Sequence, residues 1–529
     1  MVQCAILKES NLTMKTHTMK AICSAAALAA GLSFAALAAP TEVSTVAGLI
    51  AAVQNASAND EIVVMASGSP YEFSSDQKDV VAHLYAKVKI TLRGETGNPD
   101  DVVLVGNANR ILYLAQSGNA IRDLTFRNGD CSEYEKRSEE PYDQMRGGAI
   151  HFRKSSDSTL VSNCVFRSCK SQQGGGACAE YSNSSTGGKF YDCVFDGNST
   201  STMGGGAVFR ATSANNCIFR NNFSGTSNGG ALCNVPEVVG CSIVSNATSS
   251  SGGFGGGVYD CTLTGCFVAS NYAYRCGAAA DSEFYSCTNR ANKSQGDYLE
   301  FGMTSGGSGC YAEDCVFIDA GKSGKKTFGK SAFNRCRFDE ASFVSGSYVF
   351  SQSVSMTNSL ISSVSGVRLF EGLTAASTMA SCTIASNSYT FASINSSYNP
   401  VITVRNCFFC GNNDGIDIHA VATNLVVSFE NCILSAESDD HLPGSGNYNY
   451  YSGRAAFKPG FVGAAKDPEN PFAITRRSPA YAKAGIVEDW METATDIRGE
   501  GFPRLRDGVV NIGCYQCWDK IPGLTISVN

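Results

Sequence analysis

A short phrase built around a cysteine returns about every 24 residues over most of this chain, and it constrains the fold more than any other feature. A polar or small residue precedes the cysteine and an apolar residue stands two positions after it, as in Asn163-Cys164-Val165-Phe166 and Asn216-Cys217-Ile218-Phe219. Such a period indicates one structural unit stacked many times, so the 529 residues need not be divided among several cores. Further copies are centred on Cys193, Cys241, Cys266, Cys287, Cys315, Cys336, Cys382, Cys407 and Cys432, and Ser359 replaces the cysteine in one unit.

The spacing inside the phrase predicts a short β-strand in every unit. Side chains alternate between the two faces of a strand, so the cysteine and the apolar residue two positions later share one face and point inward. In seven units an asparagine follows the cysteine by five positions, where we expect it to adopt a left-handed turn and to hydrogen-bond its copy in the next unit. These residues are Asn198, Asn222, Asn246, Asn271, Asn292, Asn387 and Asn412.

A second phrase, two glycines followed by a short apolar stretch, recurs in the first half of the chain. Glycine permits a tight bend, and the residues after it are expected to begin another strand. The copies are Gly147-Gly148-Ala149-Ile150, Gly175-Gly176-Ala177-Cys178, Gly205-Gly206-Ala207-Val208, Gly229-Gly230-Ala231-Leu232 and Gly256-Gly257-Val258-Tyr259. With no helical period between the strands, the sequence predicts an all-β, right-handed parallel β-helix solenoid.

Residues 45–56 carry the only helical pattern that bears on this fold. Val46, Leu49, Ile50 and Val53 lie on one stripe, so the segment is predicted to form a short amphipathic helix that caps the first coil and covers its unpaired strand. The predicted organisation is residues 1–38 as a signal peptide, 39–106 as N-terminal cap and first coils, 107–446 as β-helix, and 447–529 as a C-terminal capping segment.

The first 38 residues indicate export. Lys15, His17 and Lys20 precede an alanine-rich apolar run that ends at Ala36-Leu37-Ala38, a pattern that signal peptidase accepts. A transmembrane anchor is the alternative, although the run is short for a bilayer span and is built of alanine. We expect a bacterial protein that is secreted or on the cell surface, with no membrane span in the mature chain. Its net charge of −7 argues against a nucleic-acid partner.

The repeated cysteines allow two interpretations. They are a ladder of buried thiols, or they form disulfides between neighbouring coils. Stacked side chains of a parallel sheet point the same way rather than toward each other, which favours free thiols. That reasoning does not apply to two Cys-x-x-Cys pairs, Cys407 with Cys410 and Cys514 with Cys517. Each pair fits either a disulfide or half of a metal site.

The pairing of Gly-Gly-Ala with Phe-x-x-Asn, as in Phe195 to Asn198 and Phe409 to Asn412, resembles the repeats of polymorphic outer-membrane adhesins and of the pectate-lyase-like β-helix superfamily. This resemblance covers roughly residues 107–446 and implies the same solenoid. The tail is similar to the C-terminal signature of bacterial choice-of-anchor Q β-helix proteins, which are exported and mostly without assigned activity. That signature comprises Arg477 to Gly485, Asp496-Ile497-Arg498-Gly499, Pro503-Arg504, and Asn511-Ile512-Gly513-Cys514-Tyr515-Gln516.

Candidate catalytic chemistry centres on four aspartates near the end of the repeats, Asp414, Asp417, Asp439 and Asp440. The stretch Asn412 to Asp417 and the later pair Asp439-Asp440 resemble motifs of polygalacturonase-type glycoside hydrolases. Asp414 and Asp439 each follow a repeat cysteine by seven positions, so their carboxylates are expected to face one another on adjacent coils. Such a pair can serve as acid and base, can bind calcium, or can simply be solvated.

Two weaker candidates lie elsewhere. His419 and His441 flank the aspartates as possible acids or bases, or as exposed side chains. The acidic insertion 130–146 fits a binding loop, a cation site or a solvated loop. Taken together, the sequence predicts an exported or cell-surface protein that binds an extended polysaccharide or cell-surface glycan without catalysis, as an adhesin does. The alternative prediction is a polysaccharide lyase or glycoside hydrolase that acts on an acidic glycan.

Overall fold

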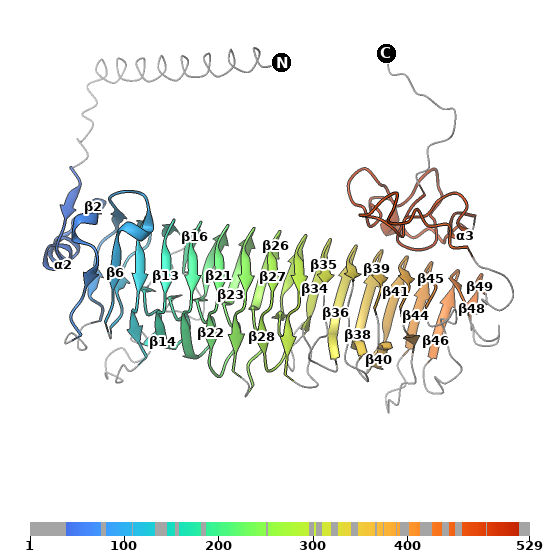
Figure 1. Cartoon of the computed structure of the whole chain (residues 1–529), viewed down its shortest axis with the longest axis horizontal. Helices are drawn as coiled ribbons and strands as arrows, with labels where there is room; N and C mark the ends of the chain where they lie inside the picture. The colour runs from blue at the N-terminus through green and yellow to red at the C-terminus, as the bar shows by residue number, and fades with distance from the viewer. Residues whose placement is uncertain are drawn as a thin grey trace, which may run out of the picture. The chain divides into compact units, whose positions relative to one another are not determined.

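The computed structural model divides the chain into two compact units, Met1–Pro40 and Thr41–Asn529, and every element below belongs to the second. The structure describes residues 39–75, 81–107, 109–132, 145–153, 158–180, 187–249, 252–295, 301–302, 309–318, 326–339, 348–364, 368–373, 375–387, 389–391, 401–412, 426–435, 444–449, 458–482 and 484–517. Its second unit is a rod of short parallel strands with a folded tail beside it (Figure 1). The predicted parallel β-helix is therefore confirmed.

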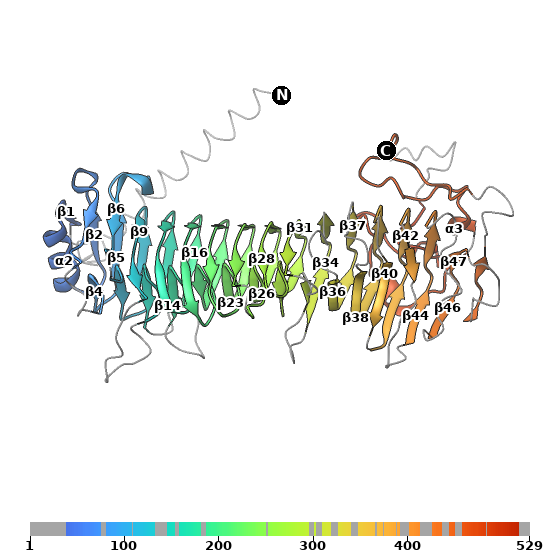
Figure 2. The same ribbon diagram turned by 60° about the horizontal axis from the view of Figure 1, so that its bottom comes forward.

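Among the described residues, three parallel sheets run along the rod. Figure 2 shows their strands stacked side by side along its length. Within the described part of the chain, sheet A has 26 strands, which include β1 (Thr41–Val43), β2 (Asp60–Val64), β12 (Leu160–Ser162), β15 (Cys178–Glu180), β16 (Gly187–Tyr191), β19 (Val208–Phe209), β23 (Leu232–Val239), β26 (Val258–Thr264), β29 (Ala279–Ala280), β30 (Glu283–Tyr285), β34 (Cys310–Glu313), β36 (Lys326–Asn334), β38 (Tyr348–Thr357) and β41 (Ser377–Ala380).

Sheet B supplies one strand per coil: β3 (Tyr71–Glu72), β6 (Val103–Val105), β9 (Thr125–Arg127), β13 (Val165–Arg167), β17 (Val194–Asp196), β21 (Ile218–Arg220), β24 (Ser242–Val244), β27 (Phe267–Ala269), β31 (Thr288–Arg290), β35 (Val316–Ile318), β37 (Arg337–Asp339), β39 (Leu360–Ser362), β42 (Thr383–Ala385), β45 (Phe408–Cys410), β47 (Ile433–Leu434) and β49 (Tyr448–Asn449). Sheet C comprises β10 (Asp130–Cys131), β14 (Lys170–Gln173), β18 (Ser199–Thr202), β22 (Phe223–Ser224), β25 (Ala247–Thr248), β28 (Tyr272–Ala273) and β32 (Lys293–Ser294).

The predicted N-terminal helix is α2 (Val46–Asn55). The Thr45 hydroxyl accepts a hydrogen bond from the Gly48 amide at 3.1 Å and caps the first turn. Leu49 and Val53 are buried in the core at the beginning of the rod, where β1 pairs with β2. The helix thus covers the end of the hydrophobic core, as the stripe of apolar residues predicted.

The repeat cysteines form a continuous inner column, and each of them is at most 2% exposed. In the middle of the rod the backbone N–H of one cysteine points at the sulfur of the next: Cys217 to Cys241 at 3.3 Å and Cys241 to Cys266 at 3.4 Å. Where Ser359 replaces cysteine, its hydroxyl accepts from the Cys336 amide at 3.1 Å. The substitution therefore keeps the same donor and acceptor arrangement.

All described cysteines are free and buried, which agrees with the thiol interpretation of the repeat cysteines. The disulfide that was one alternative for Cys407 with Cys410 and for Cys514 with Cys517 is wrong, since all four are free. Burial raises the pKa of Cys169 to about 12 and that of Cys261 to about 12. Since the thiolate is the reactive form, these sulfurs behave as small hydrophobic groups rather than as nucleophiles.

A second inner column consists of the asparagines. The Oδ1 atom of Asn222 accepts from the Asn198 amide at 3.0 Å, and Asn246 and Asn271 continue the series at 3.0 and 2.9 Å. The hydrogen bond between copies is thus confirmed, but the predicted left-handed turn at the asparagine itself is wrong. The residue just before it adopts positive φ instead, as at Asn221 (56°) and Ser270 (55°), because the amide must point inward while its neighbour makes the corner.

The glycine phrases mark the corner between sheets C and A. The first glycine has positive φ, and the second leaves no room for a side chain, since a Cβ atom on Gly206 would lie 2.1 Å from the Gly230 carbonyl oxygen. In the fifth copy the two glycines that match the other copies are Gly255 and Gly256, one residue earlier than predicted. Gly255 has positive φ (68°) and Gly256 occupies the closely stacked position. Backbone-to-backbone contact therefore selects glycine in consecutive coils.

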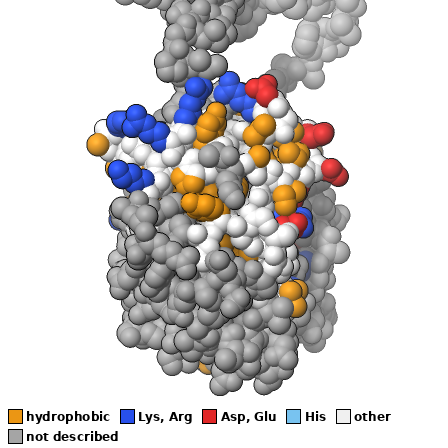
Figure 3. Space-filling model, turned by 90° about the vertical axis from the view of Figure 1, so that its right-hand side faces the viewer, with side chains coloured by type: hydrophobic (Ala, Val, Ile, Leu, Met, Phe, Trp, Pro, Cys, Tyr) orange, Lys and Arg blue, Asp and Glu red, His pale blue; other side chains and the backbone are white. Residues whose placement is uncertain are grey.

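The described part of the tail lies against the outer face of sheet B near β39 to β45, beside the coils rather than beyond the last one (Figure 1). Leu360, Phe408 and Ile433 of sheet B are at most 2% exposed because Ile512 and Tyr515 of the tail pack in the same cluster. Figure 3 looks onto this end of the molecule, where most basic side chains of the described surface lie at the left and top, acidic ones lie toward the right, and apolar ones lie between them.

Polar groups fix the tail to the coils. The left-handed asparagines that precede repeat positions donate to tail carbonyls, Asn358 to Thr495 at 2.7 Å and Asn406 to Ile486 at 2.7 Å. Within the tail, the fully buried Asp496 accepts from the Gln516 amide at 2.9 Å. Asp496 and Gln516 therefore have a structural role in holding the tail together.

We predict that Gly206→Ala lowers the free energy of unfolding by about 3 kcal/mol, because the new methyl group overlaps a backbone carbonyl of the next coil. Gly265→Ala is the matched control, since that glycine has positive φ (61°) but open space around its Cβ position, and it should lose only ~1 kcal/mol. Urea unfolding followed by circular dichroism measures both. Equal losses would show that coil stacking does not select Gly206.

Candidate functional site

The aspartates predicted as a site, Asp414, Asp417, Asp439 and Asp440, lie outside the described residues. His419 and His441 lie outside them as well, and so does most of the acidic insertion, residues 133–144. The alignment of Asp414 with Asp439, and any catalytic or calcium-binding role of this group, therefore stays a prediction.

The structure instead brings polar residues together in a cleft on sheet A with a volume of about 640 Å³. We call it the sheet A cleft. It extends from β23 to β41 and is lined by Asn234, Pro236, Asp260, Cys261, Thr262, Asp281, Ser282, Glu283, Gly309, Cys310, Tyr311, Lys330, Ser331, Ala332, Ser353, Val354, Ser355, Ala376 and Thr378. Its size falls in the range of sites that hold small molecules or a few units of a polymer.

One wall of the cleft is a column of residues at a backbone corner. Asn234, Asp260, Asp281 and Lys330 all have positive φ, between 37° and 58°. The residues just before the first three pair in register, Cys233 with Tyr259 and Tyr259 with Ala280. The side chains of Asn234, Asp260 and Asp281 therefore occupy equivalent positions on successive coils, about 4.8 Å apart.

The floor of the cleft is a row of outward-facing side chains in direct register across six strands: Thr262, Glu283, Tyr311, Ala332, Ser355 and Thr378. The hydroxyls of Ser355 and Thr378 are 3.1 Å apart. A ligand that follows the rod axis would thus meet a new side chain at every coil, about every 4.8 Å.

Local hydrogen bonds orient the carboxylates. The Asn234 amide donates to Asp260, and the Gly309 backbone N–H donates to Asp281 at 3.4 Å. The Glu283 carboxylate accepts from the Tyr285 hydroxyl at 3.1 Å. Asp260 and Glu283 are exposed and Asp281 is half-buried, so all three carboxylates remain accessible to a ligand in the cleft.

Tyr311, in the middle of the floor, is held by a charged network on its outer side. Its hydroxyl donates to Glu313 at 3.1 Å, and Glu313 also accepts from Asn334 at 3.0 Å and from Arg335 at 2.7 Å. Burial, together with the Glu313 carboxylate, raises the pKa of Tyr311 to about 12. The phenol therefore stays protonated at neutral pH and serves as a hydrogen-bond donor.

No group of three or more His, Cys, Asp or Glu side chains within the described ranges is arranged to hold a metal ion. The three carboxylates of the cleft are thus spread along the rod rather than gathered around one point. Among the same residues, no helix is long and apolar enough to cross a bilayer.

Sequence analysis missed this cleft, although a signal for it exists. In consecutive coils a polar residue follows the closely stacked glycine by four positions: Arg210 after Gly206, Asn234 after Gly230, Asp260 after Gly256 and Asp281 after Gly277. The signal was hidden because the fifth glycine phrase was aligned one residue late and because Cys276, with φ of 59°, replaces the first glycine in the next coil.

Comparisons with known proteins complete the description of the chain. No protein family model matches the sequence, and no curated protein matches it. Among solved structures, a pectate lyase, Pel9A, aligns at 10% identity over 88% of this chain and 90% of its own, with a TM-score of 0.24. A PL6 family polysaccharide lyase from Pseudopedobacter saltans aligns at 11% identity over 85% and 99%, with a TM-score of 0.27. Likenesses at these scores support no conclusion about function.

We predict that Tyr311→Phe reduces the alkaline destabilisation of the protein. Because the pKa of about 12 exceeds the ordinary 10.0, the folded state keeps a proton that the unfolded chain loses. That stabilisation is complete below pH 10 and disappears as pH rises toward 12. Between pH 9 and pH 11, the urea midpoint of unfolding should fall further for the wild type than for Tyr311→Phe. Tyr272→Phe is the control for the loss of a hydroxyl elsewhere. Equal falls in the wild type and Tyr311→Phe would contradict the assignment.

Proposed function

We propose that this protein is an exported or cell-surface β-helix that binds a polysaccharide chain along the sheet A cleft without cleaving it. The observation that carries the proposal is the in-register floor from Thr262 to Thr378. Hydroxyl and carboxylate groups repeat along it at the strand spacing, which suits a polymer of similar repeating units. We also propose that residues 1–38 direct export, and that the protein is related to choice-of-anchor Q proteins or to polymorphic outer-membrane adhesins.

Charge favours a neutral or amino-sugar chain over an acidic one in this cleft. Asp260, Asp281 and Glu283 line it against a single basic residue, Lys330. A uronate polymer would meet three carboxylates without an opposing charge on that half of the cleft, which is unfavourable in a partly desolvated site. Neutral hydroxyls or ammonium groups, by contrast, can donate hydrogen bonds to the same oxygens.

We predict that neutral or amino-sugar polysaccharides in the gel, such as glucan, xylan or chitosan, retain the purified protein in affinity electrophoresis. Asp281→Asn combined with Glu283→Gln should weaken retention at least tenfold, because both carboxylates line the cleft. Asp192→Asn is the matched control, since Asp192 is also exposed, with φ of 53°, and lies outside the cleft lining. Failure to bind any such polymer, or an equal loss in the control, would refute the proposal.

Hydrolysis of a glycan is the second candidate function, and one observation favours it. Asp260 and Asp281 stand at equivalent corners of adjacent coils, and stacked carboxylates about 5 Å apart can act as acid and nucleophile on a glycosidic bond. In that case incubation with a bound glycan would release reducing ends, and Asp260→Asn and Asp281→Asn would each abolish the release. Binding without new reducing ends supports the non-catalytic proposal. Calcium binding or catalysis at Asp414 and Asp439 is a separate, untested proposal.

A further inference from the structure

A second surface, on sheets B and C, carries exposed apolar side chains together with cations. Ile218, Phe223, Phe267 and Tyr272 are between 37% and 42% exposed, although most large apolar residues of these coils are buried. Ile218 and Phe223 belong to one coil, and Phe267 and Tyr272 belong to the coil two further along. We call this surface the ridged face.

Small side chains occupy the coil between these two pairs. Ser242 lies in register between Ile218 and Phe267, and Ala247 lies in register between Phe223 and Tyr272. The large side chains therefore form two ridges that cross the rod, two strand spacings or about 10 Å apart. A flat ring centred in the trough between them would lie about 5 Å from each ridge, the distance of a stacked contact.

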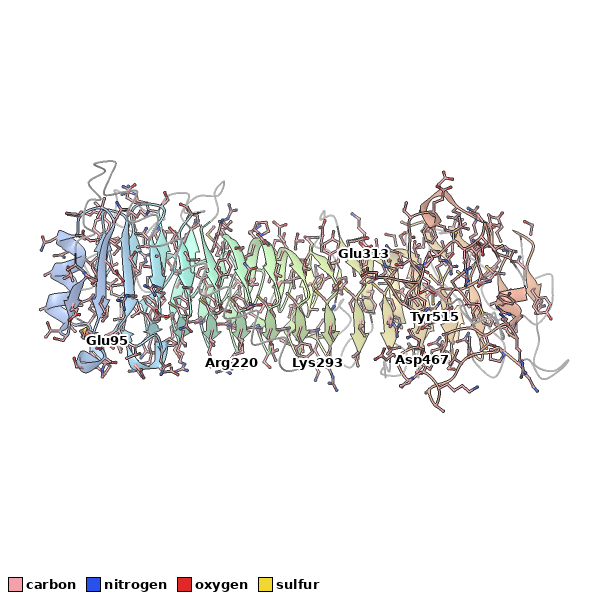
Figure 4. All side chains as sticks on the ribbon, turned by 90° about the horizontal axis from the view of Figure 1, so that it is seen from above. Glu95, Arg220, Lys293, Glu313, Asp467 and Tyr515 are labelled. Carbon is pink, nitrogen blue, oxygen red and sulfur yellow. The ribbon has the colours of Figure 1, made fainter. Side chains whose placement is uncertain are left out.

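Three cations lie on or next to the two ridges. Arg220 stands on the first ridge, and Arg290 and Lys293 stand on the coil after the second ridge, where they are in register with Ala269 and Tyr272. The carboxylate of Asp196 pairs with Arg220 at 2.9 Å. Figure 4 shows Arg220 and Lys293 along the same long side of the rod. A net positive border on a protein of net charge −7 favours an anionic ligand.

We propose that the ridged face binds an anionic polysaccharide, with sugar rings packed in the trough against the ridges and carboxylate or sulfate groups paired with Arg220, Arg290 and Lys293. This surface lies on different sheets from the sheet A cleft, so the inference stands independently of the proposed function. The four apolar side chains expose on the order of 300 Å² in total, well below the roughly 800 Å² that each partner buries in an ordinary protein interface. About three-fifths of each of these residues is already covered, which leaves little apolar area for binding to a bilayer.

The proposal is tested with the full chain, with polygalacturonate and dextran sulfate as anionic probes and unmodified dextran as the neutral one. We expect both anionic polymers to slow the protein in affinity electrophoresis, and we expect any binding of dextran, which the sheet A cleft would provide, to be unchanged by substitutions on the ridged face. Phe267→Ala combined with Tyr272→Ala should weaken retention at least tenfold, whereas Tyr272→Phe should keep it because the ring remains. Leu160→Ala is the matched control, since Leu160 of β12 is 40% exposed on sheet A, and its retention should stay within twofold of the wild type.

Several outcomes would overturn the proposal. The first is that neither anionic polymer binds. A second is that binding survives the double alanine variant but is lost in 0.2 M salt, which would show charge attraction alone. A third is that vesicles of anionic phosphatidylglycerol bind more tightly than the polymers and lose binding in the double variant, which would identify a membrane surface. Circular dichroism of each variant establishes that it is folded.

Discussion

The exact stacking of one coil on the next governs the rest of this structure. Inside the rod, backbone amides donate to the sulfur of the next repeat cysteine and to the side-chain oxygen of the next asparagine, so both columns run parallel to the axis. Each such bond forms only when the coils are in register. A shift by one residue would turn every inward side chain to the outside, and that penalty fixes the register along the whole rod.

This constraint explains the residues at the corners. Where the chain must turn sharply to bring the next strand into place, positive φ recurs just before the repeat cysteine, just before the ladder asparagine, and at the first glycine of the second phrase. Where neighbouring backbones come into contact, only glycine fits, as at Gly206 and Gly230. Once corners and interior are fixed in this way, the outward positions are free to vary, and the sheet A cleft and the ridged face both arise from that freedom.

The sequence predicted the fold well because its main determinant is periodic. The cysteine and asparagine columns, the capping helix at 46–55 and the serine substitution at Ser359 all followed from spacing and alternation. The position of the left-handed residue could not be inferred, since many residue types occupy it, including Asp192, Ala291 and Arg335. The sheet A cleft was missed for a related reason: its residues are neighbours only across coils, and insertions of different length separate them in the chain. Docking of the tail on sheet B depends on contacts such as Asn406 with Ile486, 80 residues apart, which no local pattern reveals.

Thiol accessibility tests the internal ladder most directly. The chain has 23 cysteines: Cys4 and Cys23 lie outside the described residues, and the other 21 are buried and free. In native buffer without reductant, a maleimide reagent should label at most those two. After unfolding in guanidinium chloride, still without reductant, it should also label all 21 cysteines from Cys131 to Cys517. Rapid labelling of several repeat cysteines in the folded protein would place them outside the core, and a shortfall after unfolding would reveal disulfides; either result would contradict the stacked thiol column on which the fold depends.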